Sequence, residues 1–170
     1  MSSLLIGQVV FFASVGLILY VYFGYPLLMF VLARLTSSTV ARAEIEPTVS
    51  FIITAFNEER DIRKKLENTF ALGYPSDKLE IIVASDASTD GTETIVREFA
   101  GRGVKLVRQT QRRGKTAAQN LAVEHAAGEI LVFSDATSKY ERNAVRELTA
   151  NFADRSVGCV AGKLVYSDPA

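Results

Sequence analysis

The chain has 170 residues, 48% of them hydrophobic and 22% charged, which is the composition of a globular protein enriched in apolar residues. Its 19 basic residues balance 19 acidic ones, so it lacks the electrostatic footprint of a nucleic-acid-binding protein and we expect no nucleic-acid partner. A single cysteine, Cys159, excludes an intrachain disulfide and a multi-cysteine metal site.

The first 33 residues carry no charged side chain, and the run from Leu4 to Leu32 is almost entirely apolar. Because about 20 such residues can cross a bilayer, residues 1–33 are predicted to form a transmembrane anchor. A cleaved signal peptide is disfavoured, since the apolar region is too long and no basic segment precedes it. Pro26 follows a cluster of tyrosines and predicts a kink, with one long tilted helix as the alternative.

Basic residues follow this span but do not precede it. Arg34 and Arg42 come directly after the apolar run, so the positive-inside rule places the following domain in the cytoplasm. Residues 34–47 are polar, lack strong periodicity and end in proline, which is typical of a linker. The sequence therefore predicts a protein of the cell (inner) membrane with a single N-terminal span and a cytoplasmic soluble domain.

Residues 48–170 alternate between strand-like and helix-like segments. Short runs rich in β-branched residues predict strands at 49–54, 79–84, 104–107, 130–133 and 157–165. Apolar residues at helical spacing predict helices between them, at 62–70, after Asp90, at about 116–127 and at about 142–152. This alternation predicts an α/β fold with a doubly wound, mainly parallel sheet.

Polar residues follow the first two predicted strands, at the edge where ligands bind in such sheets. Glu58 and Glu59 are explained by the dipole of the helix that they precede. Asp90 can cap the next helix. Asp86 is then left to accept a hydrogen bond from a base imide or a ribose hydroxyl, with an Asx-turn as the alternative.

The third and fourth strands are followed by groups that suit a diphosphate and a cation. Arg113, Gly114 and Lys115 place positive charge and backbone N–H groups at the start of a helix, although a solvated basic loop is the alternative. The segment is not a P-loop, because Gln109 stands where that motif requires glycine. Asp135 emerges where a nucleotide-bound divalent cation needs oxygen ligands.

In this order, the motifs resemble those of the family 2 glycosyltransferases, which have the GT-A fold. The resemblance is strongest to the membrane-anchored bacterial branch with the cellulose, hyaluronan and poly-N-acetylglucosamine synthases. The matching segments are Ala55–Glu59, Tyr74-Pro75, Asp86–Thr92, Arg113–Lys115 and Asp135–Thr137. Thr137 departs from the family pattern, which usually has a second aspartate there.

The resemblance implies an inverting hexosyltransferase of polysaccharide or glycoconjugate synthesis, with Mg²⁺ or Mn²⁺, a UDP-linked sugar donor and a glycan or lipid acceptor. It implies that Asp86 holds the uracil or ribose, that Lys115 lies near the diphosphate and that Asp135 contacts the nucleotide and the metal ion. The implied nucleotide-sugar-binding residues are Ala55, Asn57, Glu58, Asp86, Arg113, Gly114, Lys115, Ser134 and Asp135.

By the same resemblance, residues 48–170 are the donor-binding half of a GT-A domain, and the catalytic base is expected beyond Ala170. A membrane-tethered module that binds a nucleotide sugar without transferring it is the main alternative. A nucleotidyltransferase ranks last, because the loop after the first strand is neither glycine-rich nor basic.

Overall fold

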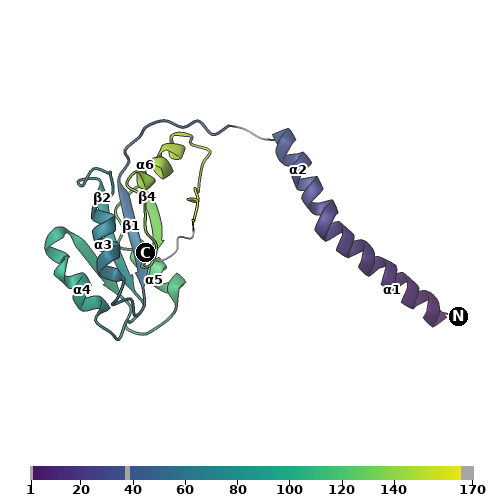
Figure 1. Cartoon of the computed structure of the whole chain (residues 1–170), viewed down its shortest axis with the longest axis horizontal. Coiled ribbons are helices and arrows are strands. Elements are labelled where there is room, and N and C mark those ends of the chain that lie inside the picture. Colours follow the sequence, from purple (N-terminus) through teal and green to yellow (C-terminus); the bar gives the residue numbers. More distant parts are fainter. Residues whose placement is uncertain (1, 37–38, 166–170) are drawn as a thin grey trace. The chain divides into compact units, whose positions relative to one another are not determined.

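A computed structural model describes residues 2–36 and 39–165. The chain divides into two compact units, Met1–Thr39 and Val40–Ala170. The first unit is helical, and the second combines helices with a sheet (Figure 1).

The first unit is one uninterrupted helical run. It consists of α1 (Ser2–Leu19), a π-helical turn (Tyr20–Gly24) and α2 (Tyr25–Thr36). Pro26 is the second residue of α2, two positions after the end of the π turn at Gly24. The wider turn before it accommodates the backbone hydrogen bond that proline cannot donate. The helix thus continues past Pro26, as in the single-helix alternative.

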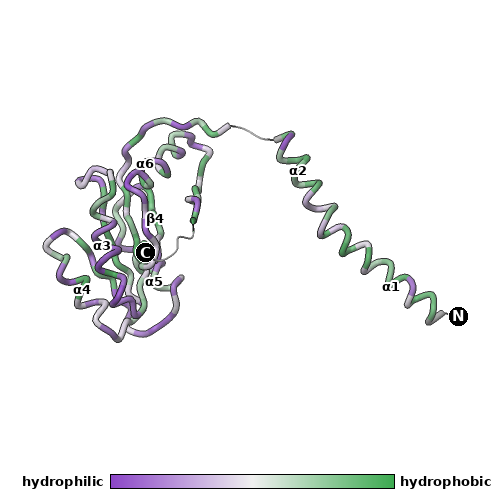
Figure 2. Tube along the Cα trace, in the orientation of Figure 1, coloured by the Kyte–Doolittle hydropathy of each residue, from purple (hydrophilic) through white to green (hydrophobic). Residues whose placement is uncertain are grey.

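The helical run is apolar along most of its length (Figure 2). The helical segment 4–35 is long and apolar enough to cross a membrane, and the side chains of its most apolar stretch are exposed. A signal sequence would meet the same criterion, so the helix by itself is weak support for a membrane anchor.

The second unit is built on four parallel strands: β1 (Val49–Ala55), β2 (Leu79–Ser85), β3 (Val104–Arg108) and β4 (Ile130–Asp135). Their spatial order is β3-β2-β1-β4. The central strand β1 is buried along almost its whole length, which explains its continuous run of apolar residues. The predicted parallel sheet is confirmed.

Helices cover both faces of this sheet, as a doubly wound fold requires. Helices α3 (Ile62–Phe70), α4 (Thr92–Glu98) and α6 (Ala144–Thr149) contribute to one core cluster, together with Phe51 and Ile53 of β1. Helix α5 (Lys115–Val123) covers the opposite face. Its Ala118 and Ala122 pack there among the core residues Ile52, Ile82, Ala84 and Val107.

Two predictions for the last third of the chain are corrected by the structure. The helix expected at about 142–152 is shorter, because after Thr149 the backbone tightens into a 3₁₀ turn, Ala150–Ala153. Residues 157–165 do not form the expected strand. A strand needs a hydrogen-bonded neighbour, and this largely exposed run pairs with none of the four strands in the described part of the chain.

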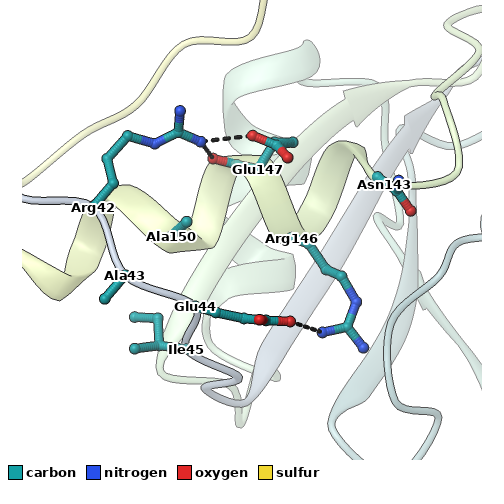
Figure 3. Close-up of a pocket in the computed structure, with 8 residues that line it drawn as sticks. All are labelled: Arg42, Ala43, Glu44, Ile45, Asn143, Arg146, Glu147 and Ala150. Atoms are coloured by element: carbon teal, nitrogen blue, oxygen red, sulfur yellow. Dashed lines mark hydrogen bonds and ion pairs between the residues drawn. The ribbon is translucent and has the colours of Figure 1, made fainter.

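The segment before β1, within the predicted linker 34–47, packs onto α6. Arg42 forms an ion pair with Glu147 at 2.6 Å, and Arg146 of α6 forms one with Glu46 at 2.6 Å. Figure 3 shows the ion pair between Arg42 and Glu147 and the one between Glu44 and Arg146. The two segments line a surface cavity of about 400 Å³. The end of the predicted linker is therefore docked on the α/β unit, while its start is still helical.

Candidate functional site

The register of the sheet brings the carboxyl ends of all four strands to one edge. Ala55 of β1 is the partner of Ser85, and Ser85 is the partner of Arg108. On the other side of β1, Thr54 is the partner of Asp135. The strand order reverses between β1 and β4, and in open α/β sheets such a switch point is where ligands bind.

The loops after β1 and β2 are tied together by side chains. The amide oxygen of Asn57 accepts a hydrogen bond from the Thr89 N–H at 2.8 Å, and the Asn57 N–H donates to Ser88 Oγ at 3.2 Å. The Glu58 N–H donates to Thr92 Oγ1 at 2.8 Å. Asn57 has a φ of 56°, a left-handed conformation that asparagine tolerates better than most residues.

Glu59 and Asp90 cross-link the same two loops. A Glu59 carboxylate oxygen accepts the Gly91 N–H at 3.1 Å, and Asp90 accepts the Glu59 N–H at 3.1 Å. Burial raises the pKa of Asp90, but hydrogen bonds from Thr92 and Glu59 outweigh it and hold the pKa below its usual value. Glu58 and Glu59 precede α3, which begins at Ile62, and the Ile62 N–H donates to the Glu58 carbonyl at 2.9 Å.

Asp86 anchors the loop after β3. The residue is 4% exposed, and its carboxylate accepts the Arg113 N–H at 2.8 Å and the Gly114 N–H at 2.9 Å. Gly114 has a φ of 93°, which favours glycine over any residue with a Cβ. The Asp86 N–H donates to the Ala55 carbonyl at 3.0 Å. The Asx-turn alternative is therefore wrong, since the carboxylate bonds to residues 27 and 28 positions away.

Lys115, the first residue of α5, forms an ion pair with Asp135 at the end of β4. The distance from Nζ to Oδ1 is 2.5 Å, and both side chains are about half exposed, at 56% and 52%. Exposed pairs of this kind contribute little to stability, so the partners can exchange. Ser134 lies on the opposite face of β4, buried, because side chains alternate along a strand.

Negative charge gathers beside this ion pair. The pKa of Glu58 is raised by burial and then by the nearby carboxylates of Asp61, Asp90 and Asp135. Such a field attracts a cation. Nevertheless, across residues 2–36 and 39–165 no three His, Cys, Asp or Glu side chains are grouped to hold a metal ion. A cation at Asp135 would therefore need further oxygen ligands from the molecule bound there.

Two buried polar atoms near the same edge have no hydrogen-bond partner in the described part of the chain. They are Thr54 Oγ1 and Gln109 Oε1. Thr54 stands one residue before the end of β1, and Gln109 is the first residue after β3. Buried polar groups usually have partners, so these two atoms are exceptions at the strand ends. The sequence analysis missed both, although their places at strand ends would have identified them.

The structure brings most of the predicted site residues to this edge. They are Ala55, Asn57, Glu58, Asp86, Arg113, Gly114, Lys115 and Asp135. The side chains of Ser134 and Ala55 are exceptions, because both are buried. The contacts form a continuous series from the first loop through the second and third to the end of β4, so the edge is one structural unit.

Comparisons with a family model, with curated proteins and with solved structures all point to the same family. The model of Glycosyl transferase family 2 matches residues 50–170. Among curated proteins, the chain is similar to glycosyltransferase AglE of Haloferax volcanii, with 30% identity over 125 residues, covering 72% of this chain and 41% of that protein. It is also similar to the poly-beta-1,6-N-acetyl-D-glucosamine synthase of Staphylococcus epidermidis, with 29% identity over 116 residues, covering 67% and 28%.

A solved structure of similar fold is the mannosyltransferase PcManGT from Pyrobaculum calidifontis, determined in complex with GDP-Man and Mn²⁺. The TM-score is 0.72 at 38% identity, over 82% of this chain and 43% of that one. This likeness confirms the predicted GT-A fold. The chain spans less than half the length of each of these relatives.

The Asp86 contact predicts a loss of stability on truncation. Asp86→Ala leaves the Arg113 and Gly114 N–H groups without their charged acceptor, and we expect the free energy of unfolding to fall by about 2–3 kcal/mol. Chemical denaturation measures this, with the exposed Asp77→Ala as a control that should unfold like the wild type. Equal stability of Asp86→Ala and wild type would show that the carboxylate does not anchor the loop.

The raised pKa of Glu58 predicts that removing its charge increases stability, in contrast to Asp86→Ala, and that the gain depends on pH. Ionised Glu58 costs stability once the pH exceeds its ordinary pKa, so Glu58→Gln should melt at a higher temperature than wild type at pH 7. The difference should disappear near about pH 4, where the wild-type carboxyl is largely protonated. Thermal melts over this range test it, with the exposed Glu67→Gln on α3 as the control. A gain independent of pH would contradict the assignment.

Proposed function

The chain belongs to glycosyl transferase family 2, and we propose that it is the donor-binding part of an inverting hexosyltransferase. The transferase moves a sugar from a nucleotide-sugar donor to a glycan or lipid acceptor in polysaccharide or glycoconjugate synthesis. One observation carries the proposal: the Asp86-anchored loop and the Lys115–Asp135 ion pair meet at the switch point of the sheet.

The charges at this edge suit a nucleoside diphosphate. Arg113 and Lys115 supply positive charge at the start of α5, and Lys115 can leave the exposed Asp135 carboxylate for a phosphate oxygen. Asp86 already accepts two backbone N–H groups, but its Oδ2 accepts only one of them and retains a lone pair for a base or ribose hydrogen. Asp86 thus has a supporting and a binding role in this proposal.

A divalent cation fits this edge only if the donor supplies part of its coordination shell. Asp135 is half exposed and offers carboxylate oxygens, which Mg²⁺ and Mn²⁺ prefer. Thr137 offers a hydroxyl where the family usually has a carboxylate. When bound, the cation neutralises charge on the departing diphosphate. The residues of this chain would orient the donor: Lys115 would bind the phosphate end, Asp135 would hold the cation, and Asp86 would hold the nucleoside end.

The nucleotide base is proposed to be uracil, from the resemblance to poly-N-acetylglucosamine synthases. PcManGT was solved with GDP-Man, so guanine is the alternative that an experiment must separate. We propose that an acceptor hydroxyl attacks the anomeric carbon opposite the diphosphate, which inverts the configuration. We propose that the catalytic base, which removes the proton of the acceptor hydroxyl, lies outside residues 48–170.

Metal binding should depend on the nucleotide, because Asp135 is the only carboxylate at the Asp135–Thr137 motif. We expect weak binding of Mn²⁺ alone and at least about tenfold tighter binding with UDP, by calorimetric titration of the full chain. Asp135→Asn should remove the UDP-dependent part. Thr137→Asp should tighten Mn²⁺ binding without nucleotide.

Parallel titrations with GDP decide between the two bases. Tight nucleotide-free Mn²⁺ binding by the wild type, or indifference to Asp135→Asn, would place the metal elsewhere. UDP binding by a protein that never cleaves a UDP-sugar, even with its natural acceptor partners, would favour the alternative of a membrane-tethered binding module.

We also propose that the first unit anchors the chain in the cell membrane with the second unit in the cytoplasm, where nucleotide sugars are made. The apolar helix and the basic residues Arg34 and Arg42 after it support this orientation. A reporter active only outside the cytoplasm, fused after Pro47, should be inactive, and Arg34→Gln with Arg42→Gln should give mixed orientation. An active wild-type fusion would refute the proposal.

A further inference from the structure

Lys65 is a buried cation that the proposed function does not use. It lies on α3 between Ile62, Leu66 and Thr69, on the face that packs on the sheet, and it is 2% exposed. Burying an ammonium group costs free energy unless specific partners offset it. A methionine of similar length would fill the same space without that cost, so the charge itself requires an explanation.

The partners of Lys65 belong to the turn that follows Asp135. Its Nζ donates a hydrogen bond to the Ser138 carbonyl at 2.6 Å and lies 4.3 Å from the centre of the Tyr140 ring. Phe51 of β1 is a second ring at 5.3 Å. Burial lowers the pKa of Lys65 to about 8, and the charge of Asp135 opposes this shift. The side chain is therefore mainly protonated at neutral pH.

A second residue of α3 fixes the same turn. Asn68 donates to the Tyr140 carbonyl at 2.9 Å and accepts the Tyr140 N–H at 2.8 Å. Within the turn, the Ser138 N–H donates to the Asp135 carbonyl at 3.2 Å. The backbone from Asp135 to Tyr140 is thus held at three points, two of them from α3.

The turn would have room to move without these contacts. A cavity of about 270 Å³ lies between α3 and the turn, lined by Asp61, Lys64, Lys65, Asn68, Ala136, Thr137, Ser138 and Lys139. Ala136 is packed in the core, but no side chain fills the space beside Thr137 and Ser138, and there the Lys65 hydrogen bond supplies the constraint that packing does not.

We propose that Lys65 is a positioning residue, which pulls the Ser138 carbonyl toward α3 and thereby fixes the Asp135 carboxylate where a donor-bound cation requires it. The inference rests on the proposed function of this edge. It adds a residue outside the strand-end motifs to the set that determines donor affinity.

The test compares Lys65→Met with Lys64→Met, which neutralises the exposed neighbouring lysine on the same helix. Affinity for UDP with Mn²⁺ and for GDP with Mn²⁺ is measured by calorimetry on the full chain, at a temperature where every variant is folded. We expect Lys65→Met to lose about tenfold in affinity and Lys64→Met to bind like the wild type.

Hydrogen exchange separates positioning from general destabilisation. In Lys65→Met the Tyr140 amide should exchange faster, whereas the amides of β1 should exchange as in the wild type. Faster exchange throughout the core would mean that Lys65 only stabilises the fold, and this would overturn the proposal. If Lys65→Met does not fold, Lys65→Gln gives the same comparison.

Unchanged nucleotide affinity in a folded Lys65→Met or Lys65→Gln would also overturn the proposal. Failure of the wild type to bind either nucleotide is a different result, because it refutes the proposed function. The Tyr140 exchange rate then decides alone whether Lys65 holds the turn, and an unchanged rate refutes that role.

Discussion

The organisation of this edge depends on one buried carboxylate. Asp86 is almost fully buried and accepts the N–H groups of Arg113 and Gly114, which lie at the start of α5. A buried charge requires such partners, and the loop requires an acceptor for its N–H groups, so each stabilises the other. Because Lys115 follows directly, the same contact determines where its ammonium group can reach, and thus the ion pair with Asp135.

The contacts around Asp86 suggest a site that is built before the ligand arrives. Glu59 and Asp90 join the first two loops, Asp86 joins the second to the third, and Lys65 holds the turn after Asp135. Against these fixed parts, the exposed Lys115–Asp135 ion pair is the part that can exchange partners. A preorganised cradle with one exchangeable ion pair would bind a diphosphate with little ordering cost.

The sequence predicted the sheet well because parallel strands and their helices have different periods of apolar residues. The rule that ligands bind at strand ends predicted Asp86, Lys115 and Asp135 as candidate site residues without any knowledge of their contacts. It did not identify what Asp86 bonds to, since its partners lie 27 and 28 residues away. Lys65 was missed, although a lysine among Ile62 and Leu66 on an apolar helix face was a visible signal. The prediction of a strand at 157–165 was wrong because the pattern of apolar residues does not reveal whether a neighbouring strand is available for pairing.

The central claim is that these four strand ends form a single nucleotide-binding site. The most direct test is a nuclear magnetic resonance titration of the full chain with UDP and Mn²⁺, and in parallel with GDP and Mn²⁺, following every backbone amide. We expect the saturable chemical-shift changes to gather at residues 55–58, 86–90, 109–115 and 134–138. Changes centred on the cavity between Arg42 and Arg146, or the absence of any saturable change with both nucleotides, would contradict it.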